Sequence, residues 1–148
     1  MPSERRRRAR AGERMKEKAV MDALVQMKRT GNLLNELLDL TQQLGQAIDR
    51  NDQVSIQMLV AMREEPLAKL QEADQAVRDQ IAASPDGDSA AQLASLLNGE
   101  QPADGAERTQ RMLCEQVASN RRRLKQVMDL DRMLNQRLAR EQSAYERL

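Results

Sequence analysis

The stretch "AIDRNDQVSIQML", residues 47–59, decides the fold of this chain. One apolar stripe ends at Ile48 and another begins at Val54, with only a short polar segment between them. Two residues of this segment, Asn51 and Asp52, are good helix N-caps. A connection this short folds two helices back on each other, antiparallel and side by side. The stretch therefore predicts a helical hairpin.

Composition indicates an all-α protein. The 148 residues include one aromatic residue, Tyr145, and few glycines or prolines, while straight-chain helix formers dominate. No segment alternates apolar residues with polar ones in the manner of a strand. We expect an antiparallel helical bundle of three long helices, with a short extra helix and a long C-terminal helix. Its length suits one domain, which we place at residues 15–148.

The apolar periodicity gives the expected helices. Two adjacent apolar rows predict the first helix over 15–48, wide enough to face two neighbours. The second helix is expected at 53–83 with an inward row that includes Met62 and Leu67, and Pro66 predicts a kink within it. A short helix is expected at 89–97. Glycines at 31 and 45 indicate a close helix crossing.

The last 42 residues predict one long helix with a heptad seam. Its length, about 60 Å at 1.5 Å per residue, exceeds that expected for the other helices, so its C-terminal end should project or bend. The seam consists of Leu113, Val117, Asn120, Leu124, Val127, Asp131, Leu134, Leu138, Glu141, Tyr145 and Leu148.

Charge is unevenly distributed along the chain. Residues 1–14 carry many arginines without apolar periodicity, which predicts a disordered basic N-terminal arm or a frayed helix start. Residues 1–29 contain ten basic and four acidic residues, residues 30–105 contain four and thirteen, and residues 106–148 contain ten and six. An acidic hairpin beside a basic final helix favours packing within the molecule.

The residue inventory argues against chemistry. Histidine is absent and Cys114 is the single cysteine, which removes histidine acid–base catalysis and almost every transition-metal site. We expect no enzymatic activity, no cofactor and no metal, with Cys114 as a semi-buried core residue. No apolar run is long enough to span a membrane and no secretion signal is evident. A cytoplasmic protein is therefore expected.

The sequence resembles the bacterial flagellar export chaperones of the FlgN family. The matching segments are "LLNELLDLTQQLGQAIDRNDQVSIQMLVAMREEPLAKLQEADQAVR", residues 33–78, and "SNRRRLKQVMDLDRMLNQRL", residues 119–138, in a resemblance that covers about two-thirds of the chain. Two features depart from the family pattern, which are Pro66 and the arm "RRRRAR".

The resemblance implies an export chaperone that binds the amphipathic C-terminal helices of hook–filament junction proteins and delivers them to export-gate components. It implies no catalytic residue. The client-binding surface of the family lies toward the chain end, which here corresponds to Leu124, Val127, Met128, Leu130, Met133, Leu134 and Leu138. Methionines off the seam also suit a surface that adapts to different helices, although they equally suit core filler.

Two other functions compete with this interpretation. The heptad seam also fits a structural coiled coil, such as a scaffold or adaptor, in which Asn120 and Asp131 set the register of a homodimer. The arginine clusters "RRRRAR" and "NRRRLK" fit nucleic-acid binding through phosphates, but neither cluster contains an aromatic side chain for stacking bases.

Overall fold

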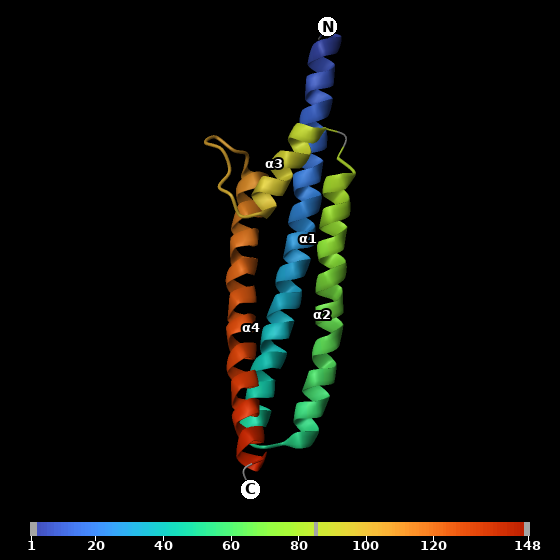
Figure 1. Cartoon of the computed structure of the whole chain (residues 1–148). Helices are drawn as coiled ribbons and strands as arrows, with labels where there is room; N and C mark the ends of the chain where they lie inside the picture. Colours follow the sequence, from blue (N-terminus) through green and yellow to red (C-terminus); the bar gives the residue numbers. More distant parts are fainter. Residues whose placement is uncertain (1–2, 85, 147–148) are drawn as a thin grey trace. The chain divides into compact units, whose positions relative to one another are not determined.

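The computed structural model describes residues 3–84 and 86–146, and within these residues the chain forms four helices and no strand. The helices are α1 (Glu4–Asp49), α2 (Gln53–Ala82), α3 (Gly87–Leu97) and α4 (Arg108–Glu146), shown along the chain in Figure 1. The predicted all-α helical bundle is confirmed. The bounds of α2, α3 and α4 lie close to the predicted ones.

The start of α1 differs from the prediction. Ser3 acts as the N-cap, because its side-chain Oγ accepts a hydrogen bond from the backbone N–H of Arg6 at 3.3 Å. Helix therefore begins at Glu4 and runs through the residues expected to form a disordered arm or a frayed helix start. With 46 residues α1 is longer than α4, which has 39, so the expectation that the last helix is the longest is wrong.

The turn between α1 and α2 closes α1 with a Schellman motif. Asn51 takes a positive φ of 54°, and its N–H donates to the carbonyl of Ile48. The N–H of Asp52 donates to the carbonyl of Ala47. Asp52 then caps α2, since its carboxylate accepts hydrogen bonds from the N–H and the hydroxyl of Ser55. The predicted hairpin turn is confirmed. Asn51 ends α1 and Asp52 begins α2.

Pro66 lies inside α2, which continues on both sides of it. The structure thus confirms a helix that runs through the proline without a break. The proline is fully buried, so its ring takes a core position although its missing N–H removes one helical hydrogen bond.

The chain divides into two compact units, and each is described by itself. Unit 1 comprises the chain up to Thr30 together with Ala73–Ser119. Its core contains Val20, Ala23, Leu24, Leu93, Leu96, Leu113 and Val117. Within this unit, Gln80 donates a 2.8 Å hydrogen bond to the carbonyl of Ala19 and links α2 to α1. The single domain expected at 15–148 stays a prediction.

The short helix α3 supplies two leucines to the core of unit 1 and is capped at both ends. At its start, the carboxylate of Asp86 accepts hydrogen bonds from the N–H of Asp88 and the hydroxyl of Ser89. These bonds, that of Ser89 first, lower the pKa of Asp86. At its end, Gly99 adopts a φ of 85° and closes a second Schellman motif.

Unit 2 comprises Gly31–Glu72 and the chain from Asn120 onward. Its main buried cluster contains Leu40, Leu44, Ala47, Ile48, Leu59 and Leu134. A Cβ added at Gly45 would lie 3.4 Å from Leu134 Cδ2, so Gly45 marks a close approach of α1 and α4, as predicted. Near the end of α1, Arg137 pairs with Asp49.

The inward row predicted for α2 is only partly correct. Leu59, Ala73 and Val77 are buried, but Met62 and Leu67 are exposed. Pro66 is buried and Arg63 partly buried on the inward side instead. Prolines and arginines are not counted in an apolar pattern, which is why the pattern placed the stripe slightly to one side.

Candidate partner-binding surface

An ion pair between α2 and α4 lies on the surface of unit 2. Arg63 Nη2 is 2.7 Å from both carboxylate oxygens of Asp131. The Arg63 side chain is 14% exposed and that of Asp131 35% exposed, so the pair is partly shielded from water. The pair fixes which edge of α2 lies beside which edge of α4.

Large apolar side chains flank this pair on both helices. Val60 and Leu67 share a stripe with Arg63 on α2, at spacings of three and four residues. Leu124, Met128 and Leu138 share a stripe with Asp131 on α4, at spacings of four, three and seven. All five are exposed. We call these five residues with Arg63 and Asp131 the α2/α4 surface.

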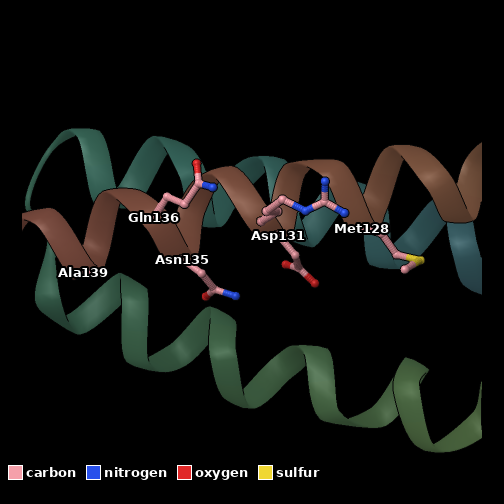
Figure 2. A pocket seen from close by; sticks show the side chains of 6 residues that line it. Met128, Asp131, Asn135, Gln136 and Ala139 are labelled. Atoms are coloured by element: carbon pink, nitrogen blue, oxygen red, sulfur yellow. The ribbon is translucent and has the colours of Figure 1, made fainter.

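The α4 side of this surface carries an open depression of about 540 Å³. In Figure 2 the side chains of Met128, Asp131 and Asn135 point toward the α2 ribbon, whereas Gln136 points away from it. The lining residues all come from α4 and are Met128, Asp131, Arg132, Asn135, Gln136 and Ala139. The depression mixes apolar contact area with amide and charged groups, a combination found where proteins bind other proteins.

The structure separates the seven residues predicted to bind a partner. Leu124, Met128 and Leu138 are exposed and belong to the α2/α4 surface. Val127 and Leu134 are only 2% and 4% exposed, so both are core residues without area to offer a partner. We therefore move these two from the predicted surface to the core.

Leu130 and Met133 belong to neither group. Leu130 is half-buried against the unit 2 cluster around Leu134. Met133 is 59% exposed, but it follows Met128 by five residues, which places it about 140° further round α4. Met133 and Met128 consequently cannot contact one partner helix along a single stripe.

Sequence reasoning missed the contribution of α2. Arg63 follows the buried Leu59 by four residues, so a charged group occupies the inward stripe of an amphipathic helix. A charge at such a position requires a partner of opposite sign, and Asp131 breaks the seam of α4 in the same way. These two polar interruptions were the signal that the edges of α2 and α4 meet.

Exposed apolar side chains are concentrated in unit 2. Among the residues whose burial is described, eleven large hydrophobic side chains are exposed, and nine of them belong to unit 2. Only Met21 and Val25 belong to unit 1. Isolated exposed apolar residues are ordinary, but several on adjoining stripes mark an interaction surface.

The described part of the chain offers neither a metal site nor a membrane span. No group of three or more cysteine, aspartate or glutamate side chains is placed to hold a metal ion among the described residues. None of the helices there contains a segment both long and apolar enough to cross a membrane. Protein-family models, curated proteins and solved structures yielded no significant match to this chain.

Proposed function

We propose that this protein binds an amphipathic helix of a partner protein on the α2/α4 surface of unit 2. The observation that carries the proposal is the pair of exposed apolar stripes on either side of the Arg63–Asp131 pair. Helix-binding proteins use such surfaces to receive apolar anchors spaced three, four and seven residues apart. Binding would cover side chains that water now contacts.

The biological role proposed is that of a cytoplasmic export chaperone of the FlgN kind. The support is the resemblance of residues 33–78 and 119–138 to that family. The hairpin turn between α1 and α2 lies within the first of these segments. Such a protein would shield the assembly-prone C-terminal helix of a hook–filament junction protein until export. It would act by binding alone, which agrees with a chain that lacks histidine.

The test uses the full chain and a synthetic amphipathic peptide. Its leucines follow one another at spacings of three and four residues, so that they form one apolar stripe along the helix. Met128→Asp should weaken binding by more than tenfold, because it places a charge where apolar area must lose water. Met21→Asp is the matched control, since Met21 is an exposed methionine of unit 1. Equal affinity of the Met128→Asp variant and the native protein would refute the proposal.

The chaperone role needs its own measurement. The C-terminal helices of hook–filament junction proteins from flagellated bacteria should bind more tightly than the synthetic peptide. The protein should also suppress aggregation of the corresponding full-length clients at equimolar ratio. Binding of the synthetic peptide without preference for these clients would leave a helix-binding adaptor and remove the flagellar role.

A further inference from the structure

Basic side chains border the α2/α4 surface on its α4 side. Arg132 lies about 100° round the helix from Asp131 and Arg121 about 60° from Leu124, both on the same side, so both border the apolar stripe. Lys125 lies in the same outer row, and its Nζ is 2.8 Å from a carboxylate oxygen of Asp129. Arg121 and Arg132 are exposed and neither forms an ion pair with another described residue, although Arg132, after the hydrogen bond from Lys125, helps to lower the pKa of the nearby Asp129.

The charge along the surface is therefore polarised. The carboxylate of Asp131 is neutralised by Arg63, which leaves Arg132 as the net charge of the depression. On the opposite edge, Glu64 lies four residues after Val60 and three before Leu67, and it is exposed. One border of the surface is thus basic and the other carries an acidic residue.

We propose that the partner helix carries aspartate or glutamate along the edge that lies over α4. This inference rests on the proposed function and specifies the chemistry of its partner. Charges at the rim of an interface raise the rate of association and fix orientation more than they add affinity. An acidic edge would pair with Arg121 and Arg132, while Glu64 would repel acidic residues on the other edge.

Two other occupants are less well matched to the same surface. A nucleic acid would bring phosphates to the arginines, but it would also meet Glu64 and aliphatic side chains that cannot stack on bases. A second copy of the chain could offer Glu64 from the same surface, but the carboxylate of Asp131 there is already paired with Arg63. An acidic amphipathic helix satisfies the apolar stripes and the basic border together.

The experiment compares three peptides that share one apolar face. One edge of the helix carries Glu, Gln or Lys, and the other edge carries Gln in all three peptides. Because a helix can dock in either direction, changing one edge alone avoids a reversal that would hide the effect. We expect the Glu-edged peptide to bind about three- to tenfold more tightly than the Gln-edged peptide at low ionic strength, with the Lys-edged peptide weakest.

The variant Arg121→Gln/Arg132→Gln should abolish the preference for the Glu edge, so that it binds the Glu-edged and the Gln-edged peptides equally well. Arg122→Gln is the matched control, because Arg122 is exposed on the same turn but about 100° round the helix from Arg121. The preference should also decline as salt is raised, because exposed charges are screened.

The outcomes separate this inference from the proposed function. Equal binding of the Glu- and Gln-edged peptides overturns the acidic edge while helix binding stands. No binding of any of the three peptides overturns both. If sedimentation shows a dimer that Met128→Asp dissociates, or if generic DNA displaces the Glu-edged peptide, the surface serves a different occupant and the inference is wrong.

Discussion

Leu44 and Leu38 lie on the same helix but differ in burial, and this difference tests how the core of unit 2 is built. Leu44 is 5% exposed and packs with Leu59, whereas Leu38 is only half-buried. Leu44→Ala should lower the free energy of unfolding by about 2–4 kcal/mol, because it leaves a cavity. Leu38→Ala should cost less than half as much. Urea denaturation measures both, and a larger loss for Leu38→Ala would contradict this assignment of the core.

The capping carboxylate of Asp52 makes stability depend on pH. The hydroxyl of Ser55, then its N–H, lower the pKa of Asp52 from its ordinary value of 3.8. The folded protein thus binds a proton here less readily than the unfolded chain. The stabilisation is complete above about pH 3.8 and is lost as the pH falls through the lower folded pKa.

The variant Asp52→Asn isolates this effect, since asparagine also caps helices but does not titrate. Between pH 6 and pH 2, the difference in Tm between the native protein and Asp52→Asn should shrink. Ser55→Ala should also make the Tm depend less on pH than in the native protein, because it removes the hydroxyl that donates to Asp52. A difference in Tm that stays constant over this range would show that Asp52 makes no such contribution.

At the scale of elements, α2 combines two opposing effects at Pro66. The missing N–H and the clash with the preceding turn destabilise a helix by about 3 kcal/mol. The buried ring packs in the core, and its loss on substitution by alanine should cost about 1–2 kcal/mol. Since the backbone term is larger, Pro66→Ala should raise the free energy of unfolding by about 1–2 kcal/mol.

Urea denaturation of Pro66→Ala and of the native protein measures the net effect of backbone strain and ring packing on the free energy of unfolding. Ala68→Gly is the comparison on the same helix, because Ala68 is exposed and its change should cost about 1 kcal/mol through helix propensity alone. A loss of stability in Pro66→Ala would mean that the ring packing outweighs the backbone strain.

Periodicity predicted the helices well but predicted their faces less well. The hairpin at Asn51 and Asp52 followed from cap chemistry, which acts over a few residues. Met62 and Leu67 were assigned inward because a hydrophobic pattern weighs every apolar residue alike. Burial also depends on where neighbouring helices lie, and the Arg63–Asp131 pair joins residues 68 apart in sequence.

The start of α1 was missed for a local reason. Seven of the residues between Ser3 and Arg14 are charged arginines or glutamates in close succession, which favours disorder by composition. The serine cap and a glutamate in the first turn favour helix instead. The candidate surface was predicted only in part. Three of the seven α4 residues predicted to bind a partner belong to it, whereas its α2 residues depend on tertiary packing, which the sequence pattern does not show.

For the whole molecule, the two units share their helices. The boundaries at 30/31, 72/73 and 119/120 fall inside α1, α2 and α4, so no loop separates unit 1 from unit 2 at any crossing. Since a break at these points would disrupt three helices, we expect the units to unfold together. Leu44→Ala in unit 2 should therefore accelerate hydrogen exchange of the amides around Leu113 in unit 1.

Leu113→Ala is the reciprocal variant, as Leu113 is fully buried in the unit 1 core. It should accelerate exchange around Leu44 by a similar factor. If each variant affects amides of its own unit only, the units unfold independently.

The methyl groups of the methionines can report where the partner helix binds. With methyl-labelled methionines, adding the Glu-edged amphipathic peptide should shift the NMR signal of Met128. The signals of Met21 and Met112 in unit 1 should stay in place. Those of Met58 and Met133, each about 140° from the stripe of the α2/α4 surface, should also stay in place. Shifts at Met133, Met58 or Met21 with an unchanged Met128 would contradict the account.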